Sequence, residues 1–212
     1  MKSSRLAGFA VAVVCTLAAA CGGSDTGANM TGPQNGTLRM SLTDSPFPTD
    51  SVKSVNVFVV RVDGRTAPAD SAAADSATTG DSASAGGWMT LSVPDTVVNL
   101  LAYQNGNTMA LGSATLASGT YNGFRMIIDP TRSNVVLANG DTLTGTSSPG
   151  IMFPSGSRSG IKINLSSPVT ITAGGTASML LDFQVGNSFV VRGSTILQNG
   201  LLFTPVIQAT VQ

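Results

Sequence analysis

The sequence predicts an all-β fold, a single β-sandwich-like domain of about ten short and mostly antiparallel strands. Three observations carry this prediction. All 11 acidic residues are aspartate and 24 residues are glycine, and both residue types favour turns over helices. Apolar and polar residues alternate in several short segments, which is the period of a strand with one buried face. Turn-forming residues separate nearly all of these segments.

The N-terminus has the pattern of an export signal. Lys2 and Arg5 precede an apolar run at residues 6–20 that is too short to span a bilayer unaided. The run ends in L-A-A-A-C, which resembles the lipobox of bacterial lipoproteins. We therefore expect residues 1–20 to be a lipoprotein signal peptide and Cys21 to carry acyl chains such as palmitate. An ordinary secretory signal that happens to contain a cysteine is the alternative.

Two stretches have the composition of flexible chain. Residues 21–36 are small, polar and glycine-rich, which predicts a tether behind the lipid. Residues 66–87 are almost wholly Ala, Ser, Thr, Asp and Gly, which predicts a disordered insert. An O-glycosylated or partner-binding segment is the alternative for this insert. The β-sandwich domain is expected over residues 37–212, around the insert.

The strands of this domain follow from hydrophobic period. Leu38, Met40 and Leu42 alternate with polar residues, which predicts a strand with one buried face. The run 52–62 carries apolar residues on both sides, as in a central strand covered on both faces. Segment 95–104 fits either a strand or a short helix. Further strands are expected at residues 89–93, 108–116, 121–128, 134–137, 160–165, 169–172, 177–185, 188–191 and 201–211.

Turn chemistry marks the connections. Asn139-Gly140-Asp141 and Gln198-Asn199-Gly200 lie between apolar segments and offer the left-handed conformations that tight hairpins need. Both are predicted to be β-turns. Pro205 lies inside the last predicted strand and cannot donate a ladder hydrogen bond, so an edge or a bulge is expected there.

Several segments, in order along the chain, resemble one family. S-L-T-D-S-P at residues 41–46, followed by the V-x-V-x-V strand, resembles the opening of domain of unknown function family 4382. The most specific match is P-S-G with S-G-I-K within residues 154–162. Further matches lie at residues 88–91, 98–106, 116–128 and 181–183. The resemblance covers roughly residues 36–209 and implies a β-rich domain of the bacterial envelope, without an established activity.

Three positions depart from the family pattern. Asn99 stands where the family often has Asp, Ser118 replaces a Pro, and Gln184 replaces the second Asp of D-F-D. Any acidic site that the family builds on these positions is weakened in this chain.

The composition excludes much of the chemistry of known enzymes. The chain has no histidine, which excludes Ser-His-Asp and Cys-His machinery and the commonest zinc and copper sites. The absence of Glu and the 5% aromatic content argue against a glycosidase. The formal net charge of +0 shows no excess of basic residues, so nucleic acid is not an expected partner. We expect no enzymatic activity, no cofactor and no bound metal.

Two aspartates are candidates for a polar site. Asp44 lies near a proline and is expected, like Asp129, to form an Asx-turn, with a calcium ligand as the alternative. Asp182 lies between two apolar residues. It is expected to pair with a cation such as Lys162 or Arg125.

Lys162 and Trp88 are candidates for ligand contact. Lys162 stands between two isoleucines, so it points either to solvent or to a covered face, where it would need a carboxylate partner. The loop 149–160 before it either turns the chain or cradles an anion or a sugar hydroxyl. Trp88 either packs in the core or joins Tyr103 and Tyr121 as a platform for sugar rings.

These expectations combine into one hypothesis of function. The chain is predicted to be a membrane-anchored, non-enzymatic envelope lipoprotein that serves as a binding or interaction module. Its partners are the membrane, through the lipid, and a glycan or an envelope protein. The alternatives are a purely structural or assembly protein and a carbohydrate-binding domain. Gly22, rather than an aspartate, follows Cys21, which predicts the outer membrane in a bacterium with two membranes.

Overall fold

The computed structural model describes residues 34–45, 50–66, 87–154 and 159–212. Residues 1–20, Cys21, most of the predicted tether and residues 67–86 of the predicted insert lie outside this part of the chain. The described residues belong to one compact unit, Gly32–Gln212. None of the helices within them is long and apolar enough to cross a membrane.

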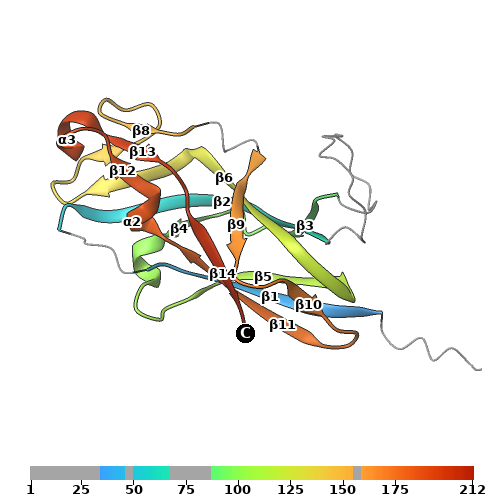
Figure 1. Ribbon diagram of the computed structural model, residues 1–212. Coiled ribbons are helices and arrows are strands. Elements are labelled where there is room, and N and C mark those ends of the chain that lie inside the picture. The colour runs from blue at the N-terminus through green and yellow to red at the C-terminus, as the bar shows by residue number, and fades with distance from the viewer. Residues whose placement is uncertain (1–33, 46–49, 67–86, 155–158) are drawn as a thin grey trace, which may run out of the picture. The chain divides into compact units, whose positions relative to one another are not determined.

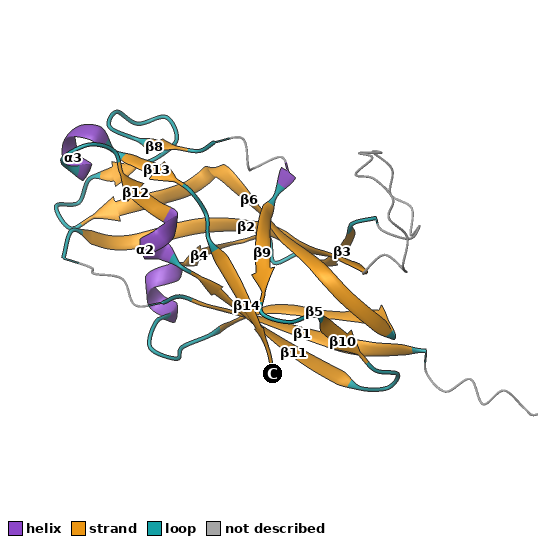
Figure 2. Ribbon diagram, viewed as in Figure 1, coloured by secondary structure: helices purple, strands orange, loops and turns teal. Residues whose placement is uncertain are grey.

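The unit consists mostly of strands, which confirms the all-β prediction (Figures 1 and 2). The helical segments among the described residues are short: a 3-10 helix at Leu100–Tyr103, α2 (Val185–Ser188) and α3 (Ile196–Asn199). The strands are β1 (Asn35–Thr43), β2 (Val52–Thr66), β3 (Met89–Ser92), β4 (Thr96–Asn99), β5 (Met109–Ala117), β6 (Gly119–Leu137), β7 (Thr142–Leu143), β8 (Ile151–Met152), β9 (Ile161–Leu165), β10 (Val169–Ile171), β11 (Thr176–Phe183), β12 (Phe189–Val191), β13 (Leu201–Phe203) and β14 (Ile207–Val211).

One mixed sheet of 11 strands dominates the unit. Its main path runs β3-β2-β6-β9-β14-β11-β1-β5, while β10 and β7 pair with β6 and β4 pairs with β2. Among the described residues, its pairs are antiparallel except β1 with β11 and β9 with β14. The two ends of the path approach each other, because a Cβ placed on Gly112 of β5 would lie 3.1 Å from Cβ of Ser92 of β3. The sheet therefore curls almost into a closed cylinder.

A second sheet of three strands, in the order β12-β13-β8, lies beside the large one. Phe203 of β13 joins the two, because its ring centroid lies 4.9 Å from that of Phe189 and 6.4 Å from that of Phe183 on β11. Phe153, just after β8, lies 5.2 Å from Phe203. Phe153 and Phe203 border an apolar cavity of about 130 Å³ that Ile128 and Ile161 also line.

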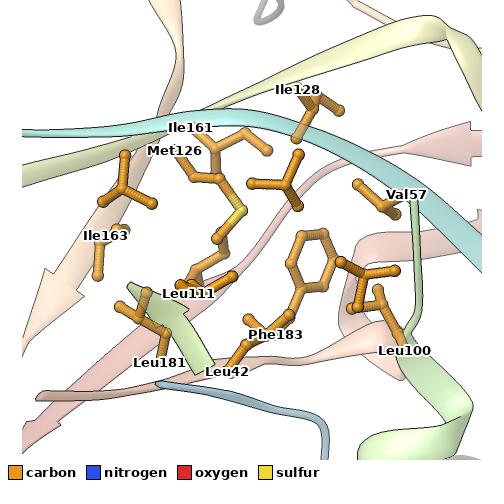
Figure 3. Close-up of a cluster of buried hydrophobic side chains, with 14 of the residues drawn as sticks. Leu42, Val57, Leu100, Leu111, Met126, Ile128, Ile161, Ile163, Leu181 and Phe183 are labelled. Atoms are coloured by element: carbon orange, nitrogen blue, oxygen red, sulfur yellow. The ribbon is translucent and has the colours of Figure 1, made fainter. Parts of the chain in front are cut away.

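The interior of the curled sheet is the hydrophobic core. Leu38, Met40 and Leu42 are at most 1% exposed, which confirms the alternation predicted for this strand. Figure 3 shows Leu42 and Phe183 among the side chains that fill the interior. Burying side chains of this size stabilises the fold by about 1.5–3 kcal/mol each, so the chain needs no internal disulfide to hold the domain.

The two longest strands exceed their predicted bounds. Segments 121–128 and 134–137, predicted as separate strands, belong to the single strand β6. Its register against β2 shifts at several points, and such irregularities let a long strand bend with the curled sheet. Residues 52–62 are confirmed as a central strand, and β2 continues to Thr66, the first residue of the predicted insert.

Several connections differ from the predictions. Segment 95–104 contains both a strand, β4, and a 3-10 helix, so each alternative holds for half of it. The turn predicted at Gln198-Asn199-Gly200 is wrong, because residues 196–199 form α3. Gly200 ends that helix with a φ of 70° and packs so tightly against Gly150 that a side chain would overlap its carbonyl oxygen. Chain packing, not a hairpin, therefore accounts for this glycine.

Two further boundaries follow from backbone chemistry. Asn139 and Gly140 form the predicted turn between β6 and β7, and Gly140 has a φ of 95°. Pro205 lies between β13 and β14, so the predicted strand 201–211 is interrupted there. β1 begins at Asn35, two residues inside the predicted tether.

Candidate functional site

A group of charged residues surrounds Trp88 on the outer face of the large sheet. It lies on β2, β6 and β9, three neighbouring strands of the sheet path, and on the segment that leads into β3. Polar residues in these strands alternate with core residues, so they all point away from the interior. We call this group the arginine–tryptophan cluster, and its members are Arg61, Asp63, Arg65, Trp88, Arg125 and Lys162.

Asp63 is the buried centre of the cluster. Its side chain is only 2% exposed, and both of its oxygens accept hydrogen bonds from guanidinium groups. Nε of Arg61 lies 2.9 Å from Oδ1, and Nε of Arg125 lies 2.9 Å from Oδ2. The hydroxyl of Thr90 on β3 donates to Oδ1 at 3.2 Å. The carboxylate therefore holds two arginines in fixed positions.

Trp88 is half-buried and lies against two guanidinium groups. Cζ of Arg125 lies 4.4 Å from the ring centroid and Cζ of Arg65 lies 5.0 Å from it. Both distances are within the range of cation–π attraction. Arg65 also crosses Gly123, where an added Cβ would lie 2.5 Å from Nε of Arg65. The indole and this glycine thus direct an otherwise flexible arginine across the sheet.

Lys162 extends the row of cations onto β9. It is the register partner of Arg125, so the two side chains stand side by side on the same face. Lys162 is exposed, which supports the solvent-facing alternative of the sequence analysis. Gly160, just before it, has a φ of 79°, and an added Cβ there would lie 2.5 Å from Cδ1 of Ile127. The carbonyl of Ser159 accepts a hydrogen bond from Arg125 at 3.3 Å.

The cluster is unevenly charged. It contains four cations and one acid, whereas the whole chain has a formal net charge of +0. Asp63 engages Arg61 and Arg125. Among the described residues, Arg65 and Lys162 have no carboxylate within salt-bridge distance. The cluster can therefore attract negatively charged groups from solution.

Asp44, one of the two aspartates predicted to form a polar site, directly follows the last residue of β1. It is 3% exposed, and its oxygens accept hydrogen bonds from the backbone N–H of Val185 at 3.0 Å and from Nε2 of Gln104 at 2.9 Å. The predicted Asx-turn is therefore wrong for Asp44, because distant segments supply its donors. It holds for Asp129, which accepts the backbone N–H of Thr131 at 2.9 Å.

Burial raises the pKa of Asp44 to about 6. The hydrogen bonds from Gln104 and Val185 oppose this rise, and the nearby charge of Asp182 adds to it. Both oxygens are already engaged and the side chain is enclosed. Asp44 therefore ties the end of β1 to the segment after the 3-10 helix and to the start of α2.

Asp182 does not pair with Lys162 or Arg125, so that prediction is wrong. Lys162 is exposed on β9, and Arg125 is bound to Asp63. Instead, the hydroxyl of Ser45 donates to Oδ2 of Asp182 at 2.7 Å. Its other oxygen is buried and lacks a hydrogen-bond partner among the described residues.

The predicted calcium alternative gains no support from this region. Within the described residues, no three histidine, cysteine or acidic side chains gather as metal ligands. The alternative of an aromatic platform made by Trp88, Tyr103 and Tyr121 is wrong for Tyr121. Tyr121 is 1% exposed and donates its hydroxyl proton to the carbonyl of Ala117, so it belongs to the core.

Sequence reasoning missed Asp63 and its two arginine partners as a site. The signal was present in R-V-D-G-R at residues 61–65, where charged residues occupy every second position. In a strand, this spacing places all three charges on one face. The predicted strand ended at Val62 and the predicted insert began at Thr66, so Asp63 and Arg65 were assigned to neither and the alternation was not recognised.

The family model described as Domain of unknown function (DUF4382) matches residues 35–200 of the chain. The match spans β1 through α3 and includes every member of the arginine–tryptophan cluster. No curated protein and no solved structure matches the chain.

Proposed function

The chain belongs to this family, DUF4382, and on that premise we propose that it is a membrane-anchored, non-enzymatic binding protein of the cell envelope. Residues 1–20 direct export, Cys21 carries the lipid, and the following residues tether the β domain. The arginine–tryptophan cluster is the face that meets the ligand.

The anchor rests on the sequence. A charged start, a short apolar run and small residues before Cys21 are the features of a lipoprotein signal. Two or three acyl chains hold a protein at a membrane far more firmly than one, because each buried CH₂ contributes about 0.8 kcal/mol. Gly22 favours the outer membrane in a bacterium with two membranes. A tether of small polar residues then leaves the domain free to search for its ligand.

The observation that carries the binding role is the position of the cluster. Two of its cations, Arg61 and Arg125, are held at the surface by a buried carboxylate, although burying a charge costs free energy. The cluster lies on the outer face of the sheet, so its side chains do not fill the hydrophobic core. An ordered, exposed set of donors is what a binding surface needs, since little conformational entropy is lost when the ligand arrives.

A structural or assembly role is the second candidate, and the small sheet favours it. Apolar side chains are exposed on β8, β12 and α3, where Met152 is 47% exposed, Val190 46%, Val191 43% and Leu197 53%. Such a patch is typical of protein association. The two roles use different faces, so variants can separate them.

The anchor is tested by the intact mass of the detergent-extracted native protein beside a Cys21→Ser variant, with membrane fractionation of both. We expect a mass of the chain from Cys21 plus a diacylglyceryl group, with a further acyl chain where the organism adds one. The variant should lose both the lipid and membrane retention. An unacylated, freely diffusing product would overturn the anchor.

The binding role is tested by cosedimentation of the purified β domain, residues 34–212, with envelope fragments of the source bacterium. Wild-type protein should sediment, and an Arg65→Ala/Lys162→Ala variant should remain largely in solution. Lys53→Ala is the matched control, because Lys53 is exposed near the other end of β2. A variant with Val190→Ser and Leu197→Ser tests the second candidate. Loss of sedimentation in that variant alone would overturn the cluster as the binding face.

A further inference from the structure

We propose that the ligand of the arginine–tryptophan cluster is an acidic polysaccharide, bound through its carboxylate or sulfate groups. This inference rests on the proposed binding function and specifies the chemistry of its ligand. It follows from the charge, the geometry and the shape of the cluster.

The donors select negatively charged oxygens. Three of the four cations are guanidinium groups, whose planar forks match carboxylate and sulfate oxygens in pairs. Arg61 and Arg125 each use Nε to hold Asp63, and Nη1 of Arg125 also donates to the carbonyl of Ser159. Both terminal nitrogens of Arg61 and Nη2 of Arg125 have no hydrogen-bond partner among the described residues and can meet a ligand. Arg65 and Lys162 meet no carboxylate among the described residues. Within the part of the chain that the structure describes, a neutral ligand would leave this excess charge unbalanced.

The cations form a row, which favours a ligand with several negative groups. Asp63 is the register partner of Arg125, and Arg125 is the register partner of Lys162. Arg65 lies two positions beyond Asp63 on β2. Side chains of directly opposed residues stand about 5 Å apart and diagonal neighbours about 7–8 Å apart. The row therefore crosses three strands, further than a single carboxylate can reach.

The shape of the surface favours an extended polymer. Small-molecule sites are usually concave, and the apolar cavity of this domain lies elsewhere, beside Phe153 and Phe203. The cluster instead lies on the outer face of a sheet, whose regular strands present their side chains in rows. A polymer with charged groups at regular intervals can bridge such a row, and each contact contributes modestly to the total affinity.

A lipid surface fits the cluster less well. Amphipathic segments that dock on anionic membranes combine cations with apolar side chains that enter the lipid. The aromatic member of the cluster, Trp88, is half-buried and lies against two arginines. Ile127, on the same face, is only 8% exposed, and Gly160 packs over it. The cluster thus offers charge without an inserting group.

The test measures binding of residues 34–212 to polygalacturonate and dextran sulfate, with neutral dextran as the uncharged control. We expect binding to both acidic polymers, none to dextran, and a loss of affinity of about tenfold or more when salt rises from about 0.05 to about 0.5 M. Arg65→Ala and Lys162→Ala should each weaken binding about two- to fivefold. The double variant should lose about tenfold, and Lys53→Ala should match the wild type.

The same binding measurement is made with three other anionic ligands. Polyglutamate, duplex DNA and phosphatidylglycerol vesicles carry negative charge on other scaffolds. Tighter binding to any of these than to both acidic polysaccharides would overturn the inference. Wild-type protein that sediments with envelope fragments through the cluster, yet ignores acidic polysaccharides, would retain the proposed binding function and refute only this ligand class. Failure of both measurements would refute both.

Discussion

Asp63 and Arg125 face each other as register partners on β2 and β6, with Nε of Arg125 2.9 Å from Oδ2 of Asp63. The carboxylate is almost fully buried, while the arginine is 19% exposed. Removal of the arginine leaves a buried charge with one partner fewer, so the cost exceeds that of an ordinary surface ion pair. Breaking this pair is therefore costly to stability, and in the proposed function the same pair positions a ligand donor.

Arg125→Ala should lower the free energy of unfolding by about 2–4 kcal/mol. Arg61 still pairs with Asp63 in this variant, so we expect the domain to remain folded despite its lower free energy of unfolding. Chemical denaturation monitored by circular dichroism measures the change. Asp63→Asn added to Arg125→Ala should recover part of the loss, because the unpaired charge is then absent.

Arg132→Ala is the control for this pair. Arg132 is 49% exposed and pairs with Asp129 and Asp95 at the surface. Pairs of this kind contribute about 0–1 kcal/mol. Cζ of Arg132 also lies 3.2 Å from the ring centroid of Phe58, and such a contact at an exposed site adds about 0.5–1 kcal/mol. If Arg132→Ala lowered the free energy of unfolding as much as Arg125→Ala does, burial of Asp63 would not be the cause of the larger expected loss.

The stability of the domain should fall as pH rises through about 6, because of Asp44. Burial raises the pKa of Asp44 to about 6 from an ordinary value of 3.8. The folded state then binds this proton more tightly than the unfolded state, so the stabilisation is complete below pH 3.8 and is lost as pH rises through about 6. The change from this group is on the order of 2–3 kcal/mol.

Asp44→Asn should remove this pH dependence. The new amide would accept the N–H of Val185 through its carbonyl and donate to the side chain of Gln104 after that side chain turns over, so the network survives. Unfolding midpoints between about pH 4 and pH 7.5 measure the slope. Asp50→Asn, at an exposed position, should leave it unchanged. A slope that persists in Asp44→Asn would assign the effect to other groups.

Asp44 and Asp63 show two different limits of prediction from the sequence. Asp44 was recognised as a polar site residue, yet its donors come from Gln104 and Val185, 60 and 141 positions away. Hydrophobic period reports which face of a strand is buried, and it identified Leu38, Met40 and Leu42 correctly. It does not report which strands become neighbours. The β1 pairing with β11 is parallel and joins segments far apart in the chain, so the partners of Asp44 could not be derived.

Asp63 illustrates a different limit. Aspartate is a residue type that mostly faces solvent, and glycine is a residue type that is common in turns. In the structure, Gly64 has no positive φ and instead lies against Leu91, whose Cδ1 would lie 2.8 Å from an added Cβ. The sequence alone does not distinguish a glycine that is required for close packing from a glycine that is required for a turn. Only the neighbouring strand distinguishes them.

Gly36→Ala should destabilise the domain by about 1–3 kcal/mol. An added Cβ would overlap the carbonyl oxygen of Thr172 and lie 2.7 Å from Cγ2 of Ile171, so β1 or β10 must shift. Gly145→Ala is the control, because its nearest neighbour, Cδ2 of Phe153, lies at an ordinary 3.5 Å. Thermal unfolding compares the two variants. Equal midpoints would show that the start of β1 yields freely, as expected of a tether rather than a strand.

Phe203→Ala should cost about 3–5 kcal/mol, the range for removing a buried phenylalanine. Phe203 is 3% exposed and borders the cavity of about 130 Å³ together with Phe153, so truncation enlarges an existing void. It also removes the ring contacts of Phe203 with Phe153, Phe183 and Phe189. Aromatic pairs add about 0.5–1.5 kcal/mol to area burial. Urea denaturation gives the loss, and Phe203→Leu should recover much of it. A cost below about 1 kcal/mol would show that β13 folds down to fill the void, and that the small sheet moves independently of the large one.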